Sequence, residues 1–221
     1  MTQDQSPKTK DQRPKPNEFA AIILAAGRSS RMGAFKPLLS FGLKSVIQTC
    51  IDNMRSGGVQ GIVVVAPAGP RSAELKAHLQ DSNITFAINP DPDSEMGASI
   101  ACGVLAVPET TKAVVIIPVD HAAVPGDVVS GLIRTWKEGA PLVIPTMAGR
   151  GGHPVLVDLA FRNDLLSLSP EQGLKGFFTE HQDQVRRLEV NSNYIARDMD
   201  TWDDYRTLHQ EIFGFPTPRR Q

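Results

Sequence analysis

The sequence predicts a single α/β domain, in which a twisted, mostly parallel sheet carries helices on both faces. Continuous apolar runs alternate along the chain with longer segments of helical periodicity. This alternation is typical of strands buried on both faces and connected by helices. The 221 residues, 41% of them hydrophobic, suffice for one sizeable core. Polar segments containing proline lie at both ends, so we expect a domain over residues 18–213, with tails over 1–17 and 214–221.

Each predicted element follows from its local pattern, in order along the chain. The short apolar runs predict strands at 19–25, 61–66, 84–88, 113–119, 141–146, 154–157 and 185–190. The amphipathic segments between and after them predict helices at 45–55, 71–79, 97–107, 126–138, 171–180 and 201–213. Right-handed connections would stack these helices on both faces of the sheet and bring the loops after the strands to one edge, where ligands bind in such folds.

Composition excludes several classes of function. No apolar run reaches the roughly 18 to 20 residues that span a bilayer. The N-terminal segment has no apolar stretch behind its charges, so we expect a cytoplasmic protein without a secretory signal. The two cysteines, Cys50 and Cys102, are far apart and form no zinc motif. A net charge of -1 argues against nucleic-acid binding but permits a small anionic ligand held by local positive charge.

The loop after the first predicted strand carries the strongest sign of chemistry. Gly27 and Gly33 enclose two serines and two arginines, and Lys36 follows three residues later. Glycines let backbone N–H groups approach an anion closely, while Arg31 and Lys36 supply full positive charges. The spacing fits neither a Walker A loop nor Gly-x-Gly-x-x-Gly. Taken alone, the loop predicts anion binding, and a solvated strand-to-helix connection is the alternative.

From position 24 to position 39 the chain reads Leu-Ala-Ala-Gly-x-Ser-x-Arg-Met-Gly-x-x-Lys-x-Leu-Leu. This segment resembles the signature of the nucleotidyltransferase family that includes molybdenum cofactor cytidylyltransferase. The resemblance extends through four motifs over residues 19–206 and implies a fold of the nucleotide-diphospho-sugar transferase type. It also implies that the loop binds a nucleoside triphosphate, with the base near Ala25 and Ala26. The nucleotide contacts that it implies are Leu24, Ala25, Ala26, Gly27, Ser29, Arg31, Gly33 and Lys36.

Two acidic residues are candidates for holding a metal ion. Asp120 directly follows the run 113–119, so it should project from a central strand into the same crevice as the first loop. Magnesium bound by one or two carboxylates would suit nucleotidyl transfer there, and a turn or a helix cap is the alternative. The segment 197–204 resembles the family's Asp-Ile-Asp-Thr-Pro-x-Asp segment, which implies that Asp200 is the second Mg²⁺ ligand. Asp198 is the alternative ligand, and acidic residues here also suit a helix N-terminus.

Two further segments resemble parts of this family. Asn89, followed by Gly97 and Ser99 at a predicted helix start, resembles a segment that flanks the nucleotide. The resemblance therefore implies nucleotide contacts for these three residues as well; helix capping is the alternative. The segment 149–154 resembles Gly-x-x-Gly-His-Pro, which lies on the acceptor side of the cleft. The acceptor contacts that we expect are His121, Arg150, Gly152 and His153. For the two histidines, a solvated or backbone-bonded side chain is the alternative.

The chain departs from the family at two places. His121 and Ala122 stand where the family has Gln-Pro or Met-Pro after the aspartate, and Trp202 replaces a proline. The first departure leaves the predicted metal ligand intact. It falls, however, where the acceptor pocket should lie, so the sequence leaves the acceptor open.

Together the motifs imply that an acceptor phosphate attacks the α-phosphate of a bound triphosphate and releases pyrophosphate. Arg31 and Lys36 would stabilise the charge, and Asp120 with Asp200 would hold Mg²⁺. The resemblance implies CTP and the phosphate of molybdopterin as substrates. A sugar- or alditol-phosphate nucleotidyltransferase is an alternative that differs in the acceptor. A non-catalytic protein that delivers a cofactor to a molybdoenzyme is another, against which the retained lysine and carboxylates argue.

Overall fold

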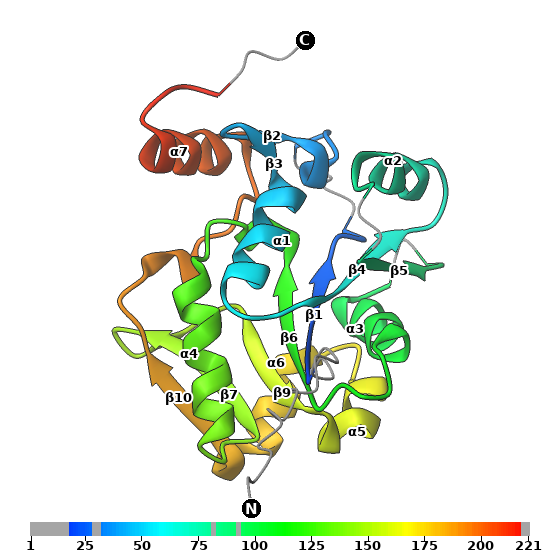
Figure 1. Cartoon of the computed structure of the whole chain (residues 1–221), viewed down its shortest axis with the longest axis vertical. Helices are drawn as coiled ribbons and strands as arrows, with labels where there is room; N and C mark the ends of the chain where they lie inside the picture. Colours follow the sequence, from blue (N-terminus) through cyan, green and yellow to red (C-terminus); the bar gives the residue numbers. More distant parts are fainter. Residues whose placement is uncertain (1–17, 28–31, 81–82, 92–93, 218–221) are drawn as a thin grey trace, which may run out of the picture.

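The computed structural model describes residues 18–27, 32–80, 83–91 and 94–217. Its main sheet contains β1 (Phe19–Leu24), β4 (Gly61–Pro67), β5 (Ile84–Asn89), β6 (Ala113–Pro118), β7 (Leu142–Met147), β8 (Arg150–Gly151), β9 (Val155–Asp158) and β10 (Val185–Glu189). The order across the sheet is β10-β7-β9-β6-β1-β4-β5, with β8 paired to β7 (Figure 1). Strands β6, β1, β4 and β5 are parallel, whereas β9 is antiparallel to both β6 and β7. The predicted mostly parallel sheet is therefore confirmed.

Seven α-helices accompany the sheet in the described part of the chain: α1 (Val46–Ser56), α2 (Pro70–His78), α3 (Met96–Ala106), α4 (Gly126–Lys137), α5 (Arg162–Leu166), α6 (Gly173–Glu180) and α7 (Trp202–Phe213). The six predicted helices are all present, with ends that differ by two residues or fewer. Helix α5 was not predicted, because its five residues are too few to display a helical period. The strands β8, β2 (Ser40–Phe41) and β3 (Lys44–Ser45) were missed because two residues are too few to show the alternation of a strand.

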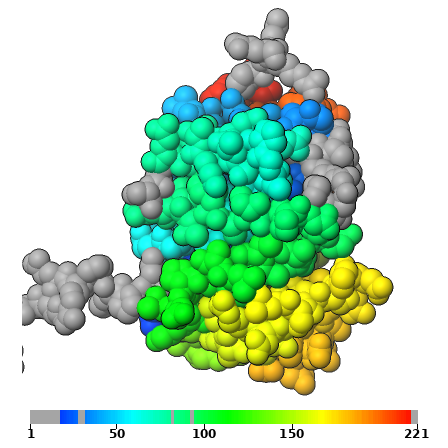
Figure 2. All heavy atoms as spheres, turned by 90° about the vertical axis from the view of Figure 1, so that its right-hand side faces the viewer, coloured from blue at the N-terminus to red at the C-terminus, as the bar shows by residue number. Residues whose placement is uncertain are grey.

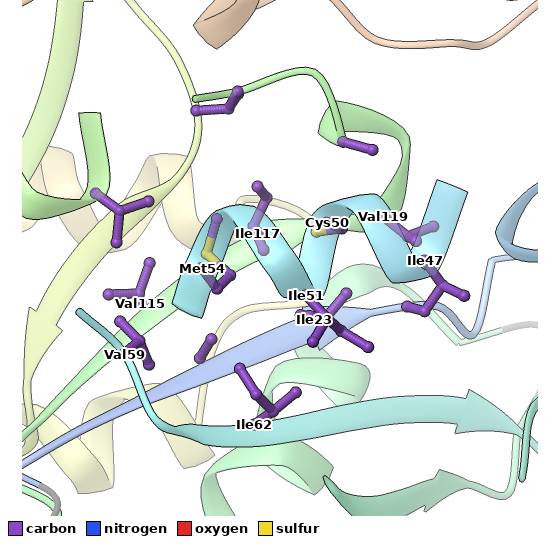
Figure 3. Close-up of a cluster of buried hydrophobic side chains, with 14 of the residues drawn as sticks. Ile23, Ile47, Cys50, Ile51, Met54, Val59, Ile62, Val115, Ile117 and Val119 are labelled. Carbon is purple, nitrogen blue, oxygen red and sulfur yellow. The ribbon is translucent and has the colours of Figure 1, made fainter. Parts of the chain in front are cut away.

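The central strand β1 is buried on both faces and divides the core into two layers. Ala21 and Ile23 point to the layer that contains α1 and α4, whereas Ala20, Ile22 and Leu24 point to the layer that contains α3, α5 and α6. This division follows from the alternation of side chains along a strand. Figure 1 shows α1 and α4 in front of the sheet and α3 behind it, and Figure 3 shows the first layer between α1 and the strands.

The second layer contains one contact at which only glycine fits. A Cβ atom built on Gly103 of α3 would lie 2.4 Å from Cγ2 of Ile22 and 3.1 Å from Cγ2 of Val65. Helix α3 can therefore approach β1 and β4 closely. This approach fixes the position of the N-terminal turn of α3, which borders the cavity described below. Figure 2 shows α3 from outside, in green, between α2 above and the yellow α5–α6 region below.

Helix α7 lies across the carboxyl end of the sheet, next to the β2–β3 hairpin (Figure 1). His209 of α7 is fully buried and accepts a hydrogen bond on Nε2 from the backbone N–H of Gly42, at 3.2 Å. Phe215, beyond the helix end, packs its ring against the same imidazole, with the ring centres 5.3 Å apart. This part of the predicted C-terminal tail therefore lies against α7.

No helix in the described residues is long and apolar enough to cross a membrane.

The close packing of α3 yields a prediction about stability. We expect Gly103→Val to lower the free energy of unfolding by about 1–3 kcal/mol, because the added methyl groups must displace Ile22 or Val65. Urea unfolding followed by circular dichroism measures this change. Leu105→Val on the exposed side of the same helix is the matched control, and we expect it to stay within about 0.5 kcal/mol of the wild type. Equal losses in the two variants would mean that β-branching in the helix, not packing, is responsible.

Candidate active site

A cavity of about 470 Å³ opens at the carboxyl ends of β1, β5 and β6. Its size is typical of small-molecule sites, and its position beside the point where the strand order reverses is where α/β sheets bind ligands. Its lining comes from four segments of the chain: Leu24, Ala25, Ala26 and Gly27; Lys36 and Pro37; Asn89, Asp91, Ser94, Glu95, Met96 and Ser99; and Pro118, Val119 and Asp120. The wall thus combines backbone after β1 with hydroxyl, amide and charged side chains.

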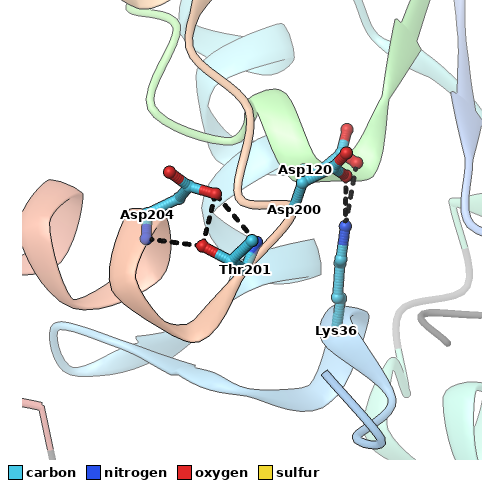
Figure 4. Close-up of polar contacts among 5 residues, drawn as sticks. All are labelled: Lys36, Asp120, Asp200, Thr201 and Asp204. Carbon is cyan, nitrogen blue, oxygen red and sulfur yellow. Dashed lines mark hydrogen bonds and ion pairs between the residues drawn. The ribbon is translucent and has the colours of Figure 1, made fainter. Parts of the chain in front are cut away.

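Lys36 joins three distant parts of the chain at one edge of this cavity. Its Nζ atom lies 3.3 Å from Oδ2 of Asp120 and 2.9 Å from Oδ1 of Asp200 (Figure 4). The lysine side chain is only 10% exposed, whereas those of Asp120 and Asp200 are 21% and 36% exposed. A buried ammonium needs such partners, because its separation from water is otherwise costly. Lys36 and Asp120 line the cavity, and Asp200 is joined to them through its ion pair with the lysine.

Local structure holds each of the two aspartates in place. Asp120 lies in the 3₁₀ turn Val119–His121 that directly follows β6, and Asn53 of α1 donates from Nδ2 to the carbonyl of Ala122 at 2.9 Å. Asp200 precedes the N-cap of α7. There Thr201 and Asp204 form a reciprocal capping box, in which each side chain accepts a hydrogen bond from the other's backbone N–H (Figure 4). The position of Asp200 therefore depends on where α7 begins.

Trp202, which replaces a proline of the family pattern, has a structural partner. Its indole N–H donates to the carbonyl oxygen of Met32 at 2.9 Å. Met32 is buried and follows the part of the first loop that lies outside the described residues. Tyr205, one turn further along α7, donates its hydroxyl hydrogen to the carbonyl of Ser40. Helix α7 is thus tied to both sides of the segment that carries Lys36.

Two imidazoles lie together next to the acidic residues. The ring centres of His121 and His153 are 4.9 Å apart, and the Nδ1 atoms of both are buried without a hydrogen-bond partner in the described structure. Burial lowers the pKa of His121, although Asp120, Asp198 and other groups oppose that shift. Burial, and then repulsion from His121, lowers the pKa of His153 to about 4. Both rings are therefore neutral at pH 7.

Asp198, which the sequence left open as an alternative metal ligand, also belongs to this acidic group. Burial raises the pKa of its carboxyl group, and the negative charges of Asp200 and Asp120 raise it further. Lys36 forms its ion pairs with the other two carboxylates. Of these two, Asp120 is among the residues that line the cavity, whereas Asp200 belongs to the site through its ion pair with Lys36.

The structure brings eight of the predicted site residues to the cavity: Leu24, Ala25, Ala26, Gly27, Lys36, Asn89, Ser99 and Asp120. Gly97 is not among the lining residues; a Cβ atom there would lie 3.3 Å from Cβ of Leu168, on the side of α5. Gly33 has a left-handed φ of 60° and is exposed. Ser29 and Arg31 lie outside the described residues.

On the acceptor side, the predicted residues are not equally placed. His121 and His153 lie in contact, and Gly152 packs so closely that a Cβ atom would come within 2.2 Å of the carbonyl oxygen of Ile195. Arg150 is exposed on the short strand β8. The histidine pair therefore adjoins the carboxylates, whereas the guanidinium of Arg150 lies on the surface.

Sequence reasoning missed part of the cavity wall between β5 and α3. Asp91, Ser94, Glu95 and Met96 all line it, and none of the four was predicted to contact the nucleotide. A signal was available, since this run of polar residues directly follows a strand that ends at the same edge as β1. Its composition is also typical of an ordinary turn, and the sequence does not distinguish the two.

Comparison with known proteins gives a consistent family. The family described as "MobA-like NTP transferase domain" matches residues 21–185. Nicotine blue oxidoreductase of Paenarthrobacter nicotinovorans is 26% identical over 197 residues, which cover 85% of this chain and 95% of that protein. Molybdenum cofactor cytidylyltransferase of Escherichia coli K12 is 29% identical over 195 residues, 86% and 94% of the two chains.

A third relative and two solved structures extend the comparison. 2-C-methyl-D-erythritol 4-phosphate cytidylyltransferase of Streptomyces coelicolor is 33% identical over 138 residues, 60% of this chain and 51% of that protein. The crystal structure of Rv0371c from Mycobacterium tuberculosis H37Rv superposes with a TM-score of 0.78 at 22% identity, covering 89% of this chain and all of that one. Its complex with manganese gives a TM-score of 0.75 at 20% identity, with the same coverage. These structural likenesses show the fold.

The buried histidine pair leads to a prediction about pH and stability. Between about pH 6.5 and pH 4 the unfolded chain would take up a proton on His153 that the folded chain excludes. The free energy of unfolding should therefore rise with pH across this window, reach its full value above about pH 6.5, and be lost as pH falls toward 4. Thermal unfolding at several pH values measures this slope. We expect His153→Gln to reduce this slope, and an unchanged slope in this variant would contradict the assignment.

Proposed function

Because the chain belongs to the MobA-like NTP transferase family, we propose that it transfers a cytidylyl group from CTP to the phosphate of a molybdopterin-type acceptor. Family membership makes the chain a nucleotidyltransferase. The proposal adds the two substrates and a divalent metal ion. It is carried by one observation, the meeting of Lys36, Asp120 and Asp200 at the edge of a nucleotide-sized cavity.

The choice of substrates rests on the relatives that align along this chain. The name of the Escherichia coli relative gives both cytidylyl transfer and the molybdenum cofactor, and it aligns over 86% of this chain. The Streptomyces relative is also a cytidylyltransferase, so two relatives with different acceptors have the same nucleotide in their names. This agreement supports CTP more strongly than it supports either acceptor. A sugar- or alditol-phosphate therefore remains the second candidate acceptor.

The two carboxylates fit a divalent cation. Asp120 and Asp200 already share one positive charge, that of Lys36, so their oxygens converge on a common region. Magnesium takes one or two protein carboxylates and completes its coordination with water and substrate phosphates. No group of three or more histidine, cysteine or acidic residues suited to a metal occurs in the described ranges. The site thus suits an ion that arrives with the nucleotide better than one permanently enclosed by protein.

The proposed reaction needs no covalent enzyme intermediate. An oxygen of the acceptor phosphate attacks the α-phosphorus of the nucleotide, the bond from that phosphorus to the bridging oxygen of the β-phosphate breaks, and pyrophosphate leaves. Lys36 provides a fixed positive charge beside the cavity, where it stabilises negative charge on phosphate oxygens. The metal ion, when bound, neutralises charge on the triphosphate and the leaving group. Gly27 leaves room for the phosphates, since no atom of the described residues lies within 4 Å of a Cβ atom built on it.

A redox function is the competing proposal from another class. It is motivated by the oxidoreductase relative, which aligns over nearly its whole length. The ion pairs of Lys36 with Asp120 and Asp200 favour transfer, because a clamp of this charge pattern suits a metal–polyphosphate. A carrier that only delivers a cofactor would have no use for such a clamp.

A substrate panel tests the proposed activity. We expect pyrophosphate release from CTP with Mg²⁺ and a molybdopterin acceptor, and much less from GTP, ATP or UTP. Asp120→Asn should reduce the rate at least about hundredfold, because it removes one of the two proposed metal ligands. Asp127→Asn, at an exposed position of α4, is the control and should retain wild-type rates.

The other outcomes of the panel discriminate between the candidates. Release only with a sugar or alditol phosphate would transfer the proposal to that acceptor. Redox conversion of nicotine blue, without pyrophosphate release from any nucleotide, would favour the oxidoreductase. Full activity of Asp120→Asn would contradict the assignment of Asp120 as a metal ligand, but it would not affect the proposed substrates.

The ion pairs also predict how a metal binds in the absence of nucleotide. Because the ammonium of Lys36 occupies the region between the two carboxylates, Lys36→Gln should bind Mn²⁺ about tenfold more tightly than the wild type, a gain of about 1.4 kcal/mol. Electron paramagnetic resonance of free Mn²⁺ measures this binding directly. Lys44→Gln, which removes an exposed lysine paired with Asp52, is the control. Weaker Mn²⁺ binding in Lys36→Gln would show that the lysine does not compete with the metal.

A further inference from the structure

Asn89 stands at the end of β5 and is only 3% exposed, although it belongs to the cavity wall. Its side-chain oxygen accepts a hydrogen bond from the backbone N–H of Asp91 at 3.1 Å. A backbone N–H can only donate, so this contact fixes which end of the amide is oxygen and which is nitrogen. The nitrogen therefore faces the opposite way, toward two serines.

Both hydrogens of that nitrogen are used within the protein. Nδ2 of Asn89 lies 2.8 Å from Oγ of Ser94 and 2.9 Å from Oγ of Ser99. An amide nitrogen has no lone pair to offer, so each hydroxyl oxygen must accept from it. Neither serine can then donate its own hydrogen to Asn89. The amide thus has no N–H left for a ligand.

The two hydroxyl hydrogens have different destinations. Ser94 donates to the carbonyl oxygen of Asp91 at 2.8 Å. Ser99, on the first turns of α3, has only the contact with Asn89 among the hydrogen bonds of the described residues, and it lines the cavity. No hydrogen bond within the described residues uses its O–H as donor, and the amide of Asn89 prevents that hydrogen from pointing toward Asn89.

We propose that Asn89 is a positioning residue that makes the Ser99 hydroxyl a hydrogen-bond donor to the nucleotide, so that the ligand atom it meets must be an acceptor. This inference rests on the proposed function, which places the nucleotide in this cavity. It assigns Asn89 no contact of its own with the nucleotide. The ligand groups that qualify are a carbonyl oxygen or an unprotonated ring nitrogen of the base. The carboxylates of Asp91 and Glu95 on the same wall would accept from an adjacent amino group, a combination found on the edge of cytosine.

Reversing the polarity of residue 89 tests this inference. Asn89→Asp keeps the shape of the side chain but replaces the donating nitrogen with an accepting oxygen. Both serines would then donate to the carboxylate, and Ser99 would present lone pairs to the acceptor atom of the ligand. We expect nucleotide affinity to fall about hundredfold in Asn89→Asp but only about tenfold in Ser99→Ala, which merely removes the donor.

The double variant separates positioning from charge. In Asn89→Asp with Ser99→Ala the wrongly oriented hydroxyl is gone, so affinity should recover to about the level of Ser99→Ala. If the new negative charge itself repelled the triphosphate, or if Asn89 contacted the nucleotide, the double variant would be at least as weak as Asn89→Asp, and the inference would be overturned. Circular dichroism and thermal unfolding confirm that each variant is folded.

Isothermal titration calorimetry with CTP, GTP, UTP and ATP in the presence of Mg²⁺, without any acceptor, provides the affinities for the full-length protein. The nucleotide that binds the wild type most tightly is the probe for the variants. Recovery in the double variant without pyrophosphate release in the activity panel would support the positioning role and refute the proposed reaction. Pyrophosphate release in the activity panel without recovery of affinity in the double variant would support the proposed reaction and refute the positioning role of Asn89. Binding of none of the four nucleotides to the wild type would overturn both.

Discussion

The ion pairs of Lys36 with Asp120 and Asp200 impose the constraint on which the site depends. The lysine is separated by 84 residues from one partner and by 164 from the other, yet its ammonium is largely withdrawn from water. Loss of either partner would leave a buried charge incompletely compensated, at a cost of several kcal/mol. The segment after β1, the turn after β6 and the approach to α7 must therefore converge. This convergence, more than any single strand, creates the edge of the cavity.

Helix α7 is the element that makes this convergence possible. Its capping box places the N-cap, Thr201, directly after Asp200, and its first turns bond to the carbonyls of Met32 and Ser40 on either side of Lys36. Trp202 forms the first of these bonds, which a proline could not, since it lacks a side-chain donor. The departure from the family pattern at this position thus replaces the rigid ring of a proline with a direct hydrogen bond to the segment that follows β1.

The sequence predicted the helices and strands that are long enough to show their periodicity, and it predicted functional residues that directly follow strands. Strand β6 and Asp120 are an example, because an apolar run followed by one carboxylate leaves few alternatives. Helix α5 and the hairpin around Gly42 were beyond prediction, since their structure depends on tertiary contacts such as the one with His209. The pairing of Lys36 with both aspartates was likewise hidden, because no local pattern encodes a contact across 164 residues.

The two sides of the site differ in how they hold charge, and this difference bears on the acceptor. The resemblance led to the expectation that His121, Arg150 and His153 contact the acceptor. His121 is, however, buried and His153 half-buried, both with lowered pKa values, and the arginine is exposed on β8. A neutral ring beside three carboxylates contributes little attraction to a phosphate dianion. The charge of an acceptor phosphate must then be balanced from the nucleotide side, by Lys36 and a metal ion, which would make acceptor binding depend on prior binding of the metal–nucleotide.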